Sequence, residues 1–223
     1  MKQVSVFLFF LALAAGLGFP QEILTADAFF KSVSDKYSTI NDYEALVNVT
    51  AGKQVMTAIL IFKSPNLLRM DFSDPQSQVI SYDGQNLVVY IPELRAVLTQ
   101  QTTNSAAMGT ATSEGLRMLS RNYSIVYESG PAAVELPGAE SERVIRLVLS
   151  RLSVAEGFRT IKLSVNPDKL LIRRMEGTTL AGDTIVYDFL QIKLNQGIPA
   201  TRFVYDSPAS ANLYNNFLFS SEN

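Results

Sequence analysis

Carboxylates, hydroxyls and amines are the side chains with which this sequence could carry out chemistry. Its 223 residues include no cysteine and no histidine. Without cysteine, the chain has no disulfide, no thiolate metal site, no thiol nucleophile and no lipid-modified cysteine. Without histidine, it lacks the commonest general base and the commonest transition-metal ligand. Most catalytic and metal chemistry is therefore excluded by composition.

The carboxylates, serines and tyrosines that remain show no catalytic spacing. No glycine-rich phosphate loop and no metal signature occurs in the sequence. We therefore expect a protein that is not an enzyme and that needs no cofactor and no metal. An enzyme that works with only two carboxylates, such as a glycosidase, stays an alternative.

Net charge and hydrophobic content narrow the class of protein further. The chain has 19 basic and 21 acidic residues, and 47% of its residues are hydrophobic. A slightly acidic balance argues against a nucleic-acid partner, because binding to nucleic acid needs clustered positive charge. The hydrophobic content is enough for a sizeable core, and the length suits one domain.

The N-terminus has the order of a secretory signal peptide. Lys2 precedes an apolar run, Val4–Phe19, which ends in alanines and glycines before Pro20. The run is shorter than the ~20 residues that span a bilayer core. We expect residues 1–18 to be a cleaved signal peptide and 19–223 to be the exported domain, with an uncleaved anchor as the alternative.

The first segment after this run is expected to be a helix. Apolar residues recur there at helical spacing, and Thr25 or Asp27 could cap its start. The stripe consists of Ala26, Phe29, Phe30, Val33, Tyr37 and Ile40. A second, weaker helix is expected at 106–122, where Gly109 and Gly115 lower helix stability by up to ~1 kcal/mol each.

The remaining chain alternates in short apolar and polar runs separated by turns such as Asp83-Gly84. We expect about ten or eleven strands, including Ala200–Tyr205, in one antiparallel meander. The segment from Tyr214 is expected to form a last strand, with an interaction tail as the alternative. Such a sheet curls into a barrel or folds into a sandwich, and periodicity alone does not choose between them.

One apolar face of these strands is a candidate ligand-binding surface, although the same residues could simply form a packed core. Arg69 alternates with Met70, which favours an outward position for this arginine over contact with a lid or a ligand. The candidate positions on the apolar face are Leu68, Met70, Phe72, Ile80, Tyr82, Leu87, Val89, Ile91, Ile161, Leu163 and Val165. Met108, Leu116 and Leu119 of the second helix are expected to cover it.

The stretch Phe62–Pro92 resembles the periplasmic outer-membrane lipoprotein carrier (LolA) family. Its Lys-Ser-Pro turn at Pro65, the proline at Pro75, the Asp83-Gly84 turn and the ending Tyr-Ile-Pro92 stand at the family's spacing. The closing segment 203–208 resembles the family's last strand. In the family's enterobacterial members an arginine that holds the lid precedes the first proline; here the residue is Ser64, and Arg69, Arg117 or Arg121 could replace it.

The resemblance implies a mainly β protein: an unclosed antiparallel β-barrel with an N-terminal helix and a mid-chain helical lid. It also implies a monomeric periplasmic carrier of acylated lipoproteins. Such a carrier loads from an inner-membrane lipoprotein-releasing transporter complex and delivers to an outer-membrane acceptor. The alternatives are a binding module for another amphiphile, such as a free lipid or a glycolipid, and a periplasmic lipoprotein sensor.

Overall fold

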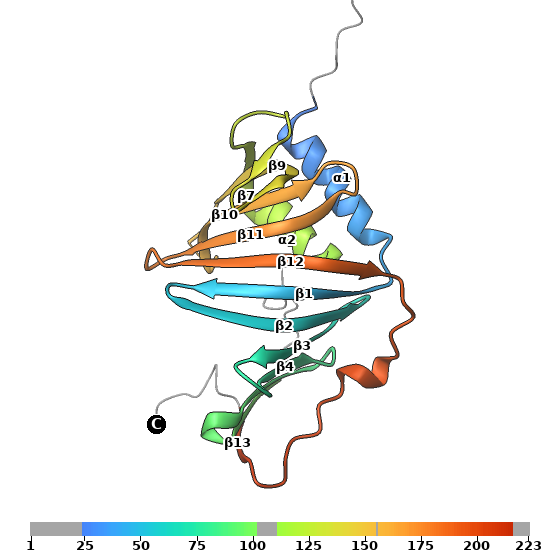
Figure 1. Cartoon of the computed structure of the whole chain (residues 1–223), viewed down its shortest axis with the longest axis vertical. Helices are drawn as coiled ribbons and strands as arrows, with labels where there is room; N and C mark the ends of the chain where they lie inside the picture. Colours follow the sequence, from blue (N-terminus) through green and yellow to red (C-terminus); the bar gives the residue numbers. More distant parts are fainter. Residues whose placement is uncertain (1–23, 102–110, 155, 216–223) are drawn as a thin grey trace, which may run out of the picture.

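A single thirteen-stranded sheet forms the framework of the molecule (Figure 1). The computed structural model describes residues 24–101, 111–154 and 156–215. Along the sheet the order is β13-β6-β5-β4-β3-β2-β1-β12-β11-β10-β9-β7, and β8 pairs with β9 beside this path. Among the described strands, β13 and β7 stand at the two ends of this order and do not pair with each other. The expected unclosed antiparallel sheet is confirmed.

The strands follow the turn signals of the sequence closely. Their bounds are β1 Asp42–Ala51, β2 Gln54–Lys63, β3 Leu67–Asp74, β4 Val79–Tyr82, β5 Asn86–Ile91, β6 Ala96–Gln101, β7 Tyr123–Tyr127, β8 Val134–Leu136, β9 Ala139–Arg151, β10 Phe158–Asn166, β11 Leu171–Thr179, β12 Thr184–Leu194 and β13 Asn212–Asn215. All pairs are antiparallel except that of β13 with β6, which is parallel.

Within the described ranges, two α-helices accompany the sheet, α1 (Ala26–Ser38) and α2 (Ser113–Asn122), with short 3₁₀ turns η1 (Pro92–Leu94) and η3 (Ala200–Phe203). The Thr25 hydroxyl caps α1 by accepting a hydrogen bond from the Ala28 N–H at 3.2 Å. The predicted stripe of α1 is buried, as its spacing required. The second helix begins later than predicted, at Ser113, because Thr112 is extended and caps it by accepting a hydrogen bond from the Gly115 N–H. Positions 106–110 of the predicted helix lie outside the described residues.

The register of the strands divides the sheet into two faces. Phe189 of β12 pairs with Val47 of β1, which pairs with Ala58 of β2, which in turn pairs with Phe72 of β3. We call the face that carries these residues the inner face, since α1 and α2 pack on it in one core cluster with β1, β2, β7 and β9–β12. The opposite face is the outer face.

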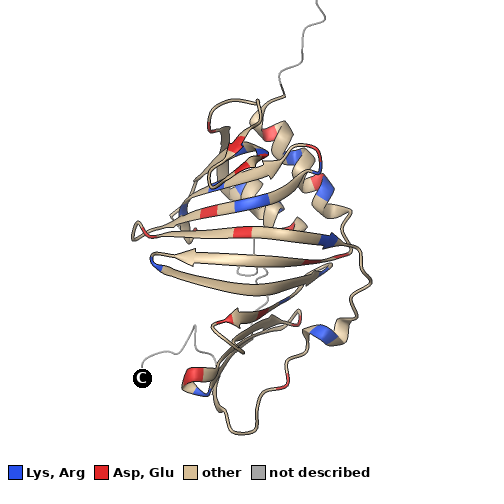
Figure 2. Cartoon of the chain, in the orientation of Figure 1, with Lys and Arg blue, Asp and Glu red and all other residues tan. Residues whose placement is uncertain are grey.

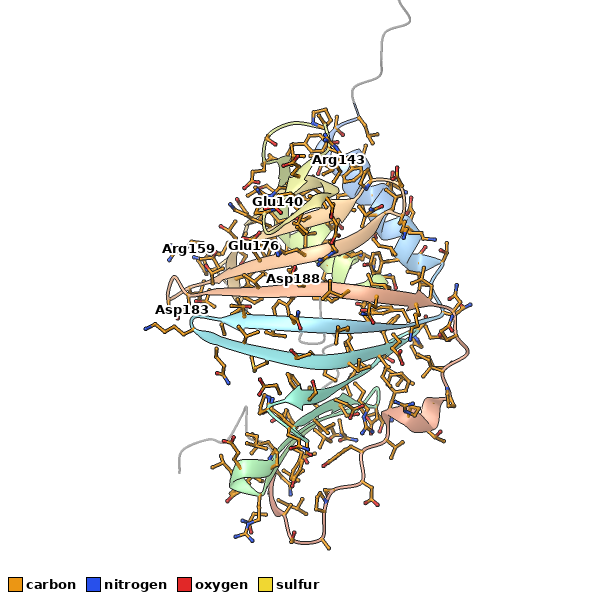
Figure 3. The ribbon with its side chains drawn as sticks, viewed as in Figure 1. Glu140, Arg143, Arg159, Glu176, Asp183 and Asp188 are labelled. Atoms are coloured by element: carbon orange, nitrogen blue, oxygen red, sulfur yellow. The ribbon has the colours of Figure 1, made fainter. Side chains whose placement is uncertain are left out.

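Charged residues gather along β9–β12 (Figure 2), with Glu176 and Asp188 labelled in Figure 3. Arg146 lies 2.8 Å from a Glu128 carboxylate oxygen, and Arg174 lies 2.7 Å from Asp188. Arg173 also reaches Asp188, at 3.1 Å. The alternation of apolar and charged residues along these strands thus matches a sheet with one packed and one solvated face.

The segment 200–205 corrects the sequence-based prediction of a strand. Residues Ala200–Phe203 form η3, which lies against the outer face of the sheet near β3. Side chains of the sheet bind its carbonyls: the Ser81 hydroxyl donates to Phe203 O at 2.6 Å, and Arg69 donates to Arg202 O at 3.1 Å. Alternation suggested a strand, but side-chain donors take the place of a backbone ladder here.

Candidate functional site

The candidate positions of the sequence share the inner face. On β3, Met70 pairs with Ile80 of β4, which pairs with Val89 of β5. Leu68, Tyr82 and Leu87 form the neighbouring row in the same order. Phe72 and Ile91 lie on the same face by the two-residue period of their strands, as do Ile161, Leu163 and Val165 of β10.

Burial separates this set into two parts. Ile161, Leu163 and Val165 are completely buried in the core cluster that α1 and α2 complete. In this conformation they are packed core, and a ligand would reach them only if the helices moved away. For these three residues the structure therefore agrees with the alternative that they form a packed core.

The other part lies on β3–β5, beyond the main contacts of the helices. The core cluster reaches Leu68, with Met70 packed at its margin. Ile80, Leu87, Val89 and Ile91 are only partly buried, and they lie outside that cluster. An apolar row thus continues from the closed core onto a partly exposed area of the same face.

Two leucines attach α2 to the core. Leu116 and Leu119 are both buried, and the helix packs on α1 and β7. Met108, the third residue predicted for the lid, lies outside the described residues. A ten-residue helix is marginal in isolation, so α2 depends on these two side chains and on its N-terminal contacts.

Two buried tyrosine hydroxyls fix the ends of the helical layer. Tyr43 of β1 donates to the Ala111 carbonyl, just before α2, at 2.9 Å. Tyr37 of α1 accepts from the Ile172 N–H of β11 at 3.1 Å, where the register of β10 and β11 shifts. Burial raises the pKa of both phenols, and for Tyr37 the Ile172 hydrogen bond opposes this rise. Both groups therefore stay neutral and hydrogen-bonded at physiological pH.

A small apolar pocket lies between the end of α1 and the sheet. Its side chains leave no room for a water-sized molecule: the cavity volume is about 0 Å³. Its walls are Tyr37, Ile40, Tyr43, Ala111, Leu171, Phe189, Ile192 and Leu194. Sites for drug-sized ligands measure about 300–1,000 Å³. This pocket is too small for a long acyl chain unless the helices shift.

Arg69 takes the outward position that alternation favoured. Its guanidinium binds the Asp71 carboxylate at 2.8 Å and the carbonyls of Arg202 and Val204, all on the outer face. It also lies 5.7 Å from the centre of the Tyr205 ring. Because α2 packs on the inner face, Arg69 fastens the C-terminal segment rather than the described part of the lid. Ser64 is exposed on the turn before β3.

The described residues hold no group of three or more acidic side chains arranged to bind a metal ion. None of the helices in the described ranges has the length and apolar character needed to cross a membrane.

Comparison with known protein families identifies the family of this chain. The model of the outer membrane lipoprotein carrier protein LolA matches residues 48–206, from within β1 to the segment after η3. The chain belongs to the LolA family. The match includes the inner-face rows of β3–β5, α2 and the buried strand β10.

Relatives of known name support the same family at modest identity. An outer-membrane lipoprotein carrier protein of Haemophilus ducreyi is 39% identical over 71 residues, which cover 31% of this chain and 33% of that protein. The outer-membrane lipoprotein carrier protein of Pseudomonas aeruginosa is 25% identical over 153 residues, covering 67% of this chain and 66% of that protein. These matches therefore span two thirds or less of the relatives' own length.

A solved structure supports the fold alone. The crystal structure of an uncharacterized conserved protein from Thermus thermophilus has a TM-score of 0.55 at 12% identity. The match covers 83% of this chain and 98% of that chain. The LolA-type sheet is thus shared with a chain of nearly unrelated sequence.

Sequence reasoning missed Tyr43 and Asp42, which fix the surroundings of the site. The Asp42 carboxylate is buried and accepts backbone hydrogen bonds from Gln196, Gly197 and Ile198, at 2.6, 3.1 and 3.2 Å. Their partners are distant in sequence, so spacing could not reveal them. The available signal was that a tyrosine at a buried position needs a hydrogen-bond partner.

Proposed function

We propose that this protein is a periplasmic carrier that shields the acyl chains of lipoproteins on its inner face and moves them from the inner to the outer membrane. The supporting observation is the apolar row on β3–β5, which continues from the closed core onto a partly exposed area. Membership in the LolA family and the export signal expected at residues 1–18 agree with this role.

Hydrophobic sequestration supplies the driving force without catalysis. Burial of each CH₂ contributes about 0.8 kcal/mol, so one acyl chain represents on the order of 10 kcal/mol before the costs of binding. Met70 at the edge of the core adapts its shape readily to flexible chains. Because the pocket between α1 and the sheet is small, we propose that acyl chains enter between the helices and β3–β5 as α2 moves.

The loading and receiving partners proposed here are an inner-membrane lipoprotein-releasing complex and an outer-membrane acceptor. Delivery between them requires that the cargo leave without nucleotide hydrolysis on this chain. An unclosed sheet helps, since its two end strands are free to separate when the cargo departs. A lid held by few contacts opens at low cost.

The test compares two adjacent valines of β5 in the source cell. Val89 lies on the inner face opposite Ile80, whereas Val88 lies on the outer face opposite Ser81, and both are partly buried. After depletion of the protein, lipoproteins should accumulate at the inner membrane. Val88→Asn should restore their delivery and Val89→Asn should not. Normal delivery in depleted cells would refute the transport role.

Purified protein distinguishes the alternatives for the cargo. Lipids extracted from the protein and identified by mass spectrometry separate a lipoprotein cargo from a free lipid or glycolipid. Transfer of a bound triacylated peptide to acceptor vesicles separates a carrier from a sensor, because a sensor retains its ligand. Saturable uptake followed by transfer supports the proposal, and binding of glycolipid alone contradicts it.

A further inference from the structure

Large aliphatic side chains stand exposed at three hairpin tips of the sheet. Their exposed fractions are 55% for Val55 after the β1–β2 turn, 66% for Leu152 and 81% for Val154 between β9 and β10, and 47% for Leu180 between β11 and β12. Tips of this kind are usually built from small and polar residues.

The register places these three tips at one end of the sheet. Ala51, next to the β1–β2 turn, pairs with Ile185 at the start of β12, and Thr184 pairs with Thr178 at the end of β11. The end of β9 lies beside the start of β10, where Thr160 pairs with Ser150. Figure 1 shows this end of the sheet on the left, and Figure 3 labels Arg159 and Asp183 there. We call this end the hairpin-tip surface.

Basic side chains accompany the aliphatic ones. The Arg159 guanidinium donates to the Leu180 carbonyl at 2.9 Å, so it lies directly beside an exposed leucine. The C-terminus of α2 is tied to the same end, because the Leu152 N–H donates to Asn122 O at 2.8 Å. The basic residues here are Lys53, Arg121, Arg151 and Arg159, against the acidic Glu156 and Asp183. This end is thus net positive, although the whole chain has a formal charge of −2.

We propose that the hairpin-tip surface contacts the face of a lipid bilayer that contains anionic lipids. Its separate aliphatic tips suit insertion into the boundary between headgroups and acyl chains, and its arginines and lysine suit the phosphates above. The three hairpins already pair their strands within the sheet, so the tips themselves offer no free strand edge to a protein partner. Such contact would bring the C-terminal end of α2 next to the membrane.

Vesicle flotation tests this surface on cargo-free protein purified from the periplasmic fraction. The vesicles contain phosphatidylcholine alone or a mixture with phosphatidylglycerol. We expect binding to the anionic vesicles that weakens as salt is added. Leu152→Ser should reduce this binding about tenfold. Leu213→Ser is the matched control, since Leu213 is 63% exposed on β13, away from the tips, and should leave binding unchanged.

Further outcomes separate the proposal from its rivals. Arg159→Gln should weaken binding to anionic vesicles and leave binding to phosphatidylcholine unchanged. Absent vesicle binding, or equal losses for Leu152→Ser and Leu213→Ser, would overturn the proposal. So would light scattering that shows a dimer dissociated by Leu152→Ser, because the tips would then bind a second copy. Uptake of acyl chains, measured separately, should not differ among these variants.

Discussion

Buried hydroxyl groups connect the helical layer of this protein to its sheet. The Tyr43 hydroxyl reaches the Ala111 carbonyl from β1, and the Tyr37 hydroxyl accepts the Ile172 N–H of β11. Each bond joins segments far apart in the sequence. Arg69, a candidate for contact with the lid, instead binds the C-terminal segment on the outer face. Tyr43 therefore ties the residue just before α2 to the sheet.

Replacement of Tyr43 by phenylalanine should loosen α2 without unfolding the protein. The variant keeps the buried ring but leaves the Ala111 carbonyl without this donor, so we expect a loss of about 0.5–1.5 kcal/mol in the free energy of unfolding. Amide hydrogen exchange of residues 113–122 should be faster. Tyr90→Phe is the control, because the Tyr90 ring stacks on Tyr205 on the outer face. Unchanged exchange in Tyr43→Phe would contradict this role.

The buried tyrosines also predict a loss of stability at alkaline pH. Burial raises the pKa of Tyr37 and Tyr43 above the ordinary value of 10.0 in the folded state. The unfolded chain then releases these protons at lower pH than the folded protein does. The contribution of the two tyrosines to the free energy of unfolding is therefore fully present below about pH 10 and falls as the pH rises toward their raised pKa values. Urea unfolding at about pH 8 and about pH 11 should show this loss. Tyr37→Phe should show a smaller loss, and an equal one would contradict the assignment.

Individual residues were predicted unevenly by the sequence. The outward position of Arg69 followed from its alternation with Met70, and Thr25 was one of two predicted caps. The role of Asp42 was not predicted, although its carboxylate accepts hydrogen bonds from three N–H groups at 196–198. Such contacts depend on which strands become neighbours, and a single sequence does not state this.

At the scale of elements, the Phe158 ring of β10 packs over Gly177 of β11, where the strand has no side chain. Gly177 of β11 lies on the inner face opposite Ile161, and a methyl group added there would lie 2.6 Å from the Phe158 ring. The ring covers the glycine and packs on the edge of the core cluster. This contact holds the start of β10 against β11, next to the register shift at Phe158.

Gly177→Ala should therefore destabilise the sheet. The added methyl group must displace the Phe158 ring, and we expect a loss of about 1–3 kcal/mol in the free energy of unfolding. Gly157→Ala is the matched control: no atom lies within 4 Å of its added methyl group, so its effect should stay within about 0.5 kcal/mol. Equal unfolding midpoints in urea for the two variants would show that Phe158 moves aside freely.

Alternation predicted the strands better than it predicted the segments around them. The turn at Asp83-Gly84, for example, does separate two strands, β4 and β5. The segment 200–205 also alternates, yet it forms η3 and binds side chains of the sheet. Periodicity reports which side of a segment is buried, but it does not report whether a neighbouring strand is present to pair with.

At the scale of the whole molecule, each face of the sheet is covered in part by another segment of the chain. The helices close the inner face over β7 and β9–β12, and the C-terminal segment lies on the outer face over β3. Between them, the inner face of β4–β5 stays apolar and partly exposed. The sequence predicted this face residue by residue. It did not predict that helices already fill the part built by β10, because helix position depends on tertiary contacts.

The central claim is that acyl chains bind on the inner face beside α2. The most direct measurement is photo-crosslinking of the purified protein with a fatty acid that carries a diazirine on its chain, followed by mass spectrometry of the labelled peptides. We predict saturable labelling of Met70, Ile80, Leu87 or Val89, reduced by competition with a triacylated peptide. Labels confined to outer-face residues such as Val88, or labelling that never saturates, would contradict the carrier function proposed here.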